Sequence, residues 1–265
     1  MHRNRTTGTE QYYTPQDVAS RCVTLMDAIA TRPLYLEPCG GTGAFITALA
    51  GREVVSYDIE PKHAAVMQTD NFLTEDLSGL KNVITITNPP FGRANSLCIP
   101  FFNKCAAVSD YIAFIVPKSW RKWSVENRLD RSFWKIHDEE LSIDYITDTK
   151  ASQGRLATVF QVWQKRDSLR PLVKVPDHGY LLKVKSPVDA DVALTVFGHG
   201  CGTVLTDFPK VHNTTKMFLK LQHPQALSAL QAVDFNRFCN NVAFTKALSF
   251  QEINYLVNEY LSTNA

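Results

Sequence analysis

The sequence predicts an α/β protein with a doubly wound, mostly parallel sheet in its first part and a small C-terminal α+β unit. Short apolar segments alternate with helical segments over residues 1–165, a rhythm typical of parallel strands covered by helices on both faces. A glycine-rich turn follows the first apolar segment. After about residue 165 the pattern changes to short alternating runs interrupted by prolines, which indicates a second, β-rich unit over residues 166–265.

The individual elements are predicted from apolar spacing. A helix is expected behind Thr14 and Pro15, because apolar residues recur at helical spacing from Val18 to Ile29. A second helix is expected behind the glycine-rich turn. In the C-terminal unit we expect a strand and, near the end, an amphipathic helix. The predicted strands are 34–37, 53–58, 83–87, 111–116, 158–163 and 180–184. The helix behind the glycine-rich turn is predicted at 43–49 and the amphipathic helix near the end at 249–261.

Composition restricts the class of protein. Of the 265 residues 45% are apolar, so the chain can bury a core. The 28 Lys and Arg against 26 Asp and Glu leave a formal net charge of +2, which argues against a strongly basic nucleic-acid arm. Six cysteines without a C-x-x-C pair argue against a zinc ribbon and favour a reducing compartment. We expect no signal peptide, no membrane span and a cytoplasmic location.

The glycine-rich turn has the chemistry of a nucleotide-binding loop. It reads Glu37-Pro38-Cys39-Gly40-Gly41-Thr42-Gly43 and stands between a predicted strand and a predicted helix. Glycines permit a sharp turn and the close approach of a ligand. The loop lacks the G-K-[ST] ending of a P-loop. Asp58 ends the next strand, 58 − 37 = 21 residues after Glu37, a spacing suited to two ribose hydroxyls. The alternative is a tight turn with a capping aspartate.

A second motif, Asn88-Pro89-Pro90-Phe91, directly follows the predicted strand at 83–87. Two consecutive prolines fix the backbone and leave a rigid arc of carbonyl acceptors. Asn88 adds a side-chain acceptor and Phe91 adds a flat apolar face. This combination suits a planar group that carries an NH₂. The alternative is a purely structural proline-rich turn with a core phenylalanine. It is less favoured because the motif occurs together with the glycine loop.

A basic and aromatic segment spans residues 118–135 and follows a predicted strand. Lys118, Trp120, Arg121 and Lys122 stand at its start. Interleaved cations and aromatic rings are typical of phosphate contacts combined with base stacking, so these four residues are predicted to bind nucleic acid. A solvated helix with core tryptophans explains the segment about equally well.

In this order the motifs resemble the S-adenosylmethionine-dependent amino-methyltransferases that act on adenine N6, in the gamma-class arrangement. The matching residues are Tyr12-Tyr13-Thr14-Pro15, the loop 37–43, Asp58, Asp70-Asn71-Phe72-Leu73 and Asn88–Phe91. The resemblance covers roughly residues 11–165. It implies a Rossmann-like methyltransferase sheet and an S-adenosylmethionine-binding catalytic domain in residues 1–165. Residues 166–265 would form a small target-recognition or accessory region.

The resemblance also implies roles for individual residues. Thr14 and the glycine loop would hold the methionine end of the cofactor, Asp58 the ribose, and Asp70 the adenine amino group beside Phe72. Asn71 separates Asp70 from Phe72, where the family often has Asp directly followed by Phe. The implied cofactor site comprises Tyr13, Thr14, Glu37, Pro38, Gly40, Gly43, Asp58, Ile59, Asp70, Phe72 and Asn88, and the catalytic set is Asn88, Pro89, Pro90 and Phe91.

The implied reaction is methyl transfer from S-adenosyl-L-methionine, without a metal, to N6 of an adenine flipped out of double-stranded DNA. Such an enzyme would be bacterial or phage-encoded, with or without a restriction partner. Two alternatives share the N-P-P-[YF] chemistry, namely an adenine in RNA and a glutamine amide in a protein. A third is an inactive subunit that only docks a partner on DNA, which the intact residues 88–91 disfavour.

Overall fold

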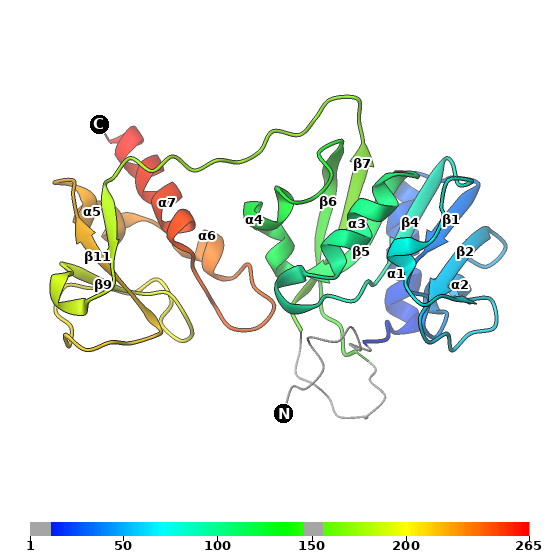
Figure 1. Cartoon of the computed structure of the whole chain (residues 1–265), viewed down its shortest axis with the longest axis horizontal. Helices are drawn as coiled ribbons and strands as arrows, with labels where there is room; N and C mark the ends of the chain where they lie inside the picture. Colours follow the sequence, from blue (N-terminus) through cyan, green and yellow to red (C-terminus); the bar gives the residue numbers. More distant parts are fainter. Residues whose placement is uncertain (1–11, 146–155, 265) are drawn as a thin grey trace. The chain divides into compact units, whose positions relative to one another are not determined.

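The structure, a computed structural model, describes residues 12–145 and 156–264. The chain divides into two units, Met1–Leu172 and Val173–Ala265, and each is described by itself (Figure 1). The expected boundary after residue 165 falls seven residues earlier than this division. No helix among the described residues is long and apolar enough to cross a membrane.

A seven-stranded sheet forms the centre of the first unit, with strand order β3-β2-β1-β4-β5-β7-β6. Every adjacent pair is parallel except the two that involve β7, which runs antiparallel to β5 and β6. This arrangement confirms the predicted doubly wound, mostly parallel sheet. The strands are β1 (Leu34–Glu37), β2 (Glu53–Asp58), β3 (Met67–Gln68), β4 (Val83–Thr87), β5 (Ser109–Pro117), β6 (Phe133–Leu141) and β7 (Thr158–Lys165).

Helices cover both faces of this sheet because its inner strands are apolar on both sides. In β5, Ile112 and Phe114 pack into one core cluster with α3, whereas Ala113 and Ile115 pack into the other with α1 and α2. The helix α1 begins one residue later than expected, with Pro15 at the N-cap and no side-chain cap. The helices are α1 (Gln16–Ile29), α2 (Ala44–Ala48), α3 (Cys98–Ala106) and α4 (Trp123–Glu126), with 3-10 turns η1 (Phe72–Thr74), η2 (Arg93–Asn95) and η3 (Lys118–Arg121).

The segment 118–135 is neither a solvated helix nor a single surface element. It begins as η3, continues through α4, and ends in β6, an edge strand that the sequence pattern did not predict. Five of the nine residues of β6 are Lys, His, Asp or Glu, so its apolar alternation is weak. Charged side chains are common on edge strands because one side of such a strand faces solvent.

The second unit is a small α+β fold, as predicted. Its four strands are antiparallel in the order β10-β9-β11-β8, and its core combines one face of this sheet with the C-terminal helices. Ser249 and Glu252 form a reciprocal capping box at the start of the last helix. The elements are β8 (Leu181–Val184), η4 (Pro187–Asp189), β9 (Val192–Thr195), β10 (Val204–Leu205), β11 (Lys216–Leu221), α5 (Ala226–Ala232), α6 (Asn236–Cys239) and α7 (Phe250–Thr263).

Arg170 holds the segment that follows β7 against the first unit. Its side chain is buried and donates hydrogen bonds to the backbone carbonyls of Glu126 (2.7 Å), Phe133 (3.2 Å) and Leu129 (3.4 Å). Its guanidinium also lies over the Trp163 ring, 5.5 Å from the ring centroid. Residues 166–172 therefore belong with the sheet.

We expect Arg170→Met to lower the free energy of unfolding by about 2–4 kcal/mol, because it leaves buried carbonyls without a donor. Urea denaturation of the full chain measures the change. Arg128→Met, at an exposed position of the same unit, is the control and should stay within about 0.5 kcal/mol of the wild type. Equal stability of the two variants would contradict the anchoring role of Arg170.

Candidate functional site

The predicted motifs meet at the carboxyl edge of the sheet, where the strand order reverses. The strand β1 lies between β2 and β4 and is parallel to both. Glu37 ends β1, Asp58 ends β2, and Asn88 follows β4. In open α/β sheets the crevice at such a switch point is where ligands bind.

Asp58 supports the glycine loop through its backbone. One carboxylate oxygen accepts the N–H of Gly41 and the other accepts the N–H of Glu60, both at 2.8 Å. Gly41 (φ 46°) and Gly43 (φ 82°) have left-handed backbone conformations that favour glycine. Each oxygen of Asp58 keeps a further acceptor lone pair, so the carboxylate can also bind hydroxyl groups.

A pocket with about 860 Å³ of space, its open mouth included, lies at this edge. The predicted residues that line it are Tyr13, Pro38, Asp58, Ile59, Phe72, Asn88, Pro89, Pro90 and Phe91, whereas Thr14, Glu37, Gly40, Gly43 and Asp70 are not among its described lining residues. Cys39 and Gly41 of the predicted glycine loop and Tyr12 of the first motif also line it, and the lining residues outside all predicted motifs are Glu60, Thr69 and Phe101.

One end of the pocket is apolar and aromatic. Ile59 is 53% exposed although it is apolar, and the buried Phe72 ring stacks on Phe101, with centroids 5.2 Å apart. Phe101 lies on α3, a helix that the sequence pattern did not predict. Asp70 is exposed, and its neighbour Thr69 lines the pocket instead. The expectation that Asp70 binds an adenine amino group stays a prediction.

Asn88 presents an oriented acceptor. Its Nδ2 donates a hydrogen bond of 2.9 Å to the backbone carbonyl of Tyr12. Its Oδ1 is buried, and no group among the described residues donates to it. A buried acceptor without a donor is costly, and such groups often mark functional positions. The Tyr12 contact therefore fixes the amide so that Oδ1 remains for a ligand that carries N–H.

Two aromatic rings line the pocket beside this acceptor. The rings of Tyr12 and Phe91 are nearly parallel, with an interplanar angle of 18° and centroids 6.4 Å apart. Tyr145 contacts Tyr12 edge to face at 5.6 Å. Tyr12 belongs to the motif Tyr12-Tyr13-Thr14-Pro15, but the spacing of that motif does not indicate these ring contacts.

Glu37 is buried beneath the glycine loop with an incomplete set of hydrogen bonds. Its Oε1 accepts from the Thr87 hydroxyl and from the Cys39 N–H (3.1 Å). Its Oε2 has no partner among the described residues. Burial raises the pKa of Glu37 to about 8, although these two hydrogen bonds oppose the shift. The carboxyl is therefore largely protonated at neutral pH.

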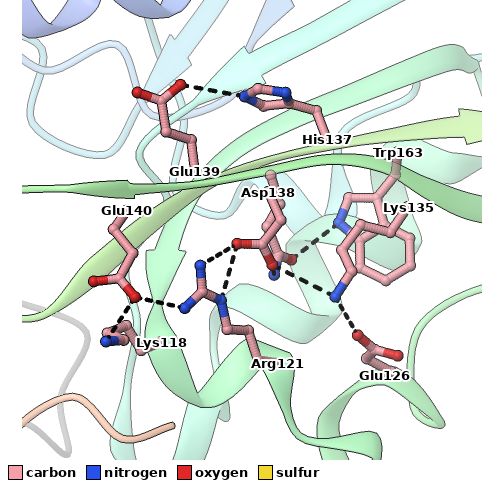
Figure 2. A network of polar contacts seen from close by, with 10 residues as sticks. Lys118, Arg121, Glu126, Lys135, His137, Asp138, Glu139, Glu140 and Trp163 are labelled. Atoms are coloured by element: carbon pink, nitrogen blue, oxygen red, sulfur yellow. Dashed lines mark hydrogen bonds and ion pairs between the residues drawn. The ribbon is translucent and has the colours of Figure 1, made fainter. Parts of the chain in front are cut away.

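The residues predicted to bind nucleic acid lie in different environments. Trp120 is completely buried and donates to Cys98 Sγ, so its ring packs in the core rather than on the surface. Lys118 and Arg121 are ion-paired to carboxylates of β6 (Figure 2). Lys122 is half-buried at the start of α4. Their binding of nucleic acid stays a prediction, but Trp120 offers no stacking face here.

The chain matches no family model and no curated protein sequence. Among solved structures it is similar to a Pyrococcus horikoshii protein assigned as an RNA methyltransferase (20% identity, TM-score 0.46, 62% of this chain and 90% of that one). It is also similar to the 23S rRNA methyltransferase ErmE (16%, 0.41, 62% and 72%). A third is the M protein of the type I restriction enzyme EcoKI (17%, 0.44, 58% and 44%). These are similarities of fold.

Glu37 is expected to make stability depend on pH. Its folded pKa of about 8 lies above the ordinary 4.5, so the folded state keeps a proton that the unfolded chain releases. The contribution of Glu37 to the free energy of unfolding is complete below pH 4.5 and is lost as the pH rises to about 8. Glutamine does not titrate, so Glu37→Gln removes this pH dependence. The free energy of unfolding of the variant, relative to that of the wild type, should therefore rise between pH 4.5 and about 8.

Urea denaturation at several pH values measures that difference. Glu53→Gln, at an exposed glutamate of β2, is the control for loss of a carboxylate. A difference between Glu37→Gln and the wild type that stays constant with pH would show that the Glu37 carboxyl does not retain its proton on folding.

Proposed function

We propose that this chain transfers a methyl group from S-adenosyl-L-methionine to the exocyclic N6 of an adenine in DNA. The observation that carries the proposal is Asn88 Oδ1, a buried acceptor without a donor among the described residues, held in place through the Tyr12 carbonyl. It stands at the switch point of the sheet, next to a rigid Pro89-Pro90 turn and the Phe91 ring. An acceptor of this kind suits a planar NH₂ group.

The cofactor end of the pocket fits a nucleoside attached to an amino acid. Asp58 would accept from the ribose hydroxyls, and Ile59, Phe72 and Phe101 would contact the adenine ring. The Oε2 of Glu37, close to the Cys39 turn, has no partner among the described residues, and as the protonated oxygen of this carboxyl it suits an acceptor reached through the glycine loop. S-adenosylmethionine supplies an electrophilic methyl group on a sulfonium, which needs no metal for its transfer.

The target end of the pocket would activate the amino group by position. The lone pair of an exocyclic adenine nitrogen is delocalised into the ring. If Asn88 Oδ1 and the Pro89 carbonyl accept its two N–H bonds, the nitrogen moves toward tetrahedral geometry and its lone pair points away from the ring. Phe91 would stack on one face of the base and Tyr12 would close the other. This is catalysis by preorganised acceptors and orientation.

Fewer observations support DNA over RNA as the substrate than support an NH₂ group as the methyl acceptor. An adenine in RNA presents the same N6 group, and a glutamine side chain presents a similar amide. The basic residues after β5 favour a nucleic acid over a protein, although Lys118, Arg121 and Lys135 are already ion-paired. The second unit would help to select the target, since the pocket itself reads only the flipped base.

The first prediction from this proposal concerns the cofactor. The protein should bind S-adenosylhomocysteine in the presence of a metal chelator, as measured by calorimetry. Asp58→Asn should weaken binding by roughly 1.5–3 kcal/mol, about 10- to 100-fold, because hydrogen bonds to a charged group are lost. Asp167→Asn removes the same charge at an exposed position outside the described pocket lining and is the matched control. No binding by the wild type would exclude the methyltransferase reading.

The second prediction concerns Asn88. Asn88→Ala should reduce methyl transfer on the order of 10²–10³-fold, the usual effect of losing one preorganised partner of a transition state. Affinity for S-adenosylhomocysteine should change little, because the lost interaction is made mainly in the transition state. The assay uses radiolabelled S-adenosylmethionine with adenine-rich duplex DNA, single-stranded DNA and RNA, followed by detection of N6-methyladenine in the product.

These measurements separate the alternatives. Methylated RNA with unmodified DNA would move the substrate to RNA while keeping the mechanism. An Asn88→Ala variant that keeps more than about a tenth of the wild-type rate would limit its contribution to roughly 1.4 kcal/mol, and the acceptor mechanism would then be wrong. Asn82→Gly, at an exposed position before β4 whose left-handed backbone (φ 56°) glycine accepts, is the control for an asparagine substitution in this segment.

A further inference from the structure

Two cations at the carboxyl edge of the sheet converge on one exposed carboxylate oxygen. Lys118 and Arg121 belong to η3, which begins directly after β5. The Oε1 of Glu140, on β6, lies 2.9 Å from Lys118 Nζ and 2.7 Å from Arg121 Nη1 (Figure 2). These two interactions hold the pKa of Glu140 below its usual range, Lys118 being the larger cause. The carboxylate is therefore ionised, and both cations are neutralised within the protein.

The three side chains of this ion-pair cluster, Lys118, Arg121 and Glu140, differ in their exposure to solvent. The Glu140 side chain is 59% exposed, whereas those of Lys118 and Arg121 are only 16% and 23% exposed. Asp138, which is 20% exposed, accepts from Arg121 Nε and Nη2 and also from Gln161. Asp138 thus fixes the guanidinium of Arg121 through Nε and Nη2, and Nη1 remains to contact Glu140. Glu140 is the member that can leave into solvent.

The cluster is linked to the Asn88 turn through the backbone and one side-chain contact. Asn95 follows the residues 88–91 on η2, and its Nδ2 donates to the Ser119 hydroxyl at 3.1 Å. Ser119 lies between Lys118 and Arg121 in η3. The strands β4 and β5, which precede these turns, are neighbours in the sheet. The two cations consequently lie on the same edge as the pocket.

We infer that Glu140 occupies a phosphate-binding site, and that a backbone phosphate of the target nucleic acid replaces it on Lys118 and Arg121. A phosphate oxygen accepts the same two N–H groups as the Glu140 oxygen. The inference rests on the proposed nucleic-acid target. It adds that the free protein carries its own competitor for that target. Binding then requires a strand that is placed well enough to displace a carboxylate, which weakens adventitious contacts.

The neighbouring glutamate provides a matched control. Glu139 lies on the opposite face of β6, where it pairs with Arg21 of α1 and lies 3.4 Å from His137 (Figure 2). Glu140→Gln and Glu139→Gln change the net charge of the protein equally, one residue apart. General attraction of a polyanion therefore changes alike in the two variants. Only Glu140→Gln releases Lys118 and the Nη1 group of Arg121, whose Nε and Nη2 stay on Asp138.

The test is fluorescence anisotropy of labelled duplex DNA, single-stranded DNA and RNA, titrated with the full chain at several KCl concentrations. Glu140→Gln should bind about three- to fivefold more tightly than the wild type, the upper part of the range expected for freeing cations from exposed ion pairs. Glu139→Gln should change affinity by less than about twofold. Adding Lys118→Gln to Glu140→Gln should cancel the gain.

Equal affinities of Glu140→Gln and Glu139→Gln, with binding by the wild type, would overturn this inference and leave the proposed function intact. Failure of the wild type and every variant to bind any of the three nucleic acids would overturn both. A gain that persists in the Lys118→Gln, Glu140→Gln double variant would also overturn the inference, because the net charge then equals that of the wild type and the gain would not depend on Lys118. Thermal unfolding of each variant checks that the fold is retained.

Discussion

The parallel pairing of β1 with both β2 and β4 is the constraint on which the site depends. It aligns Leu36 with Val55 on one side and with Thr85 on the other, so the carboxyl ends of the three strands reach the same edge. The turns that leave these strands then have to diverge, because β1 is where the strand order reverses. The pocket lies between these diverging turns, and the motifs contribute to it because each follows one of the three strands.

The site keeps polar groups that a purely structural core would pair or exclude. Glu37 Oε2 and Asn88 Oδ1 are both buried and lack partners among the described residues. Each belongs to a residue whose remaining polar atoms are fixed, by Thr87 and Cys39 in one case and by Tyr12 in the other. The surrounding fold therefore bears a cost in stability at these positions. Such a local conflict with packing is common where a protein acts on a ligand.

The charges near the site illustrate why composition alone is a poor guide to binding surfaces. The segment after β5 is rich in cations, yet Lys118, Arg121 and Lys135 pair with Glu140, Asp138 and Glu126. Cations on η3 and acids on β6 are brought together only by the return of the chain through β6. The electrostatic character of the edge is thus set by side chains from separate elements.

The sequence by itself determined the doubly wound class, the bounds of β1, β2 and β4, and most of the pocket lining. Buried parallel strands are short continuous apolar runs, and the residues that end them carry the site, so both are visible in local pattern. Only the tertiary structure decided the charged edge strand β6, the burial of Trp120 and the exposure of Asp70. It also decided that Tyr12 orients Asn88, a contact between residues 76 positions apart. These features depend on which distant elements pack together, and no local spacing encodes that.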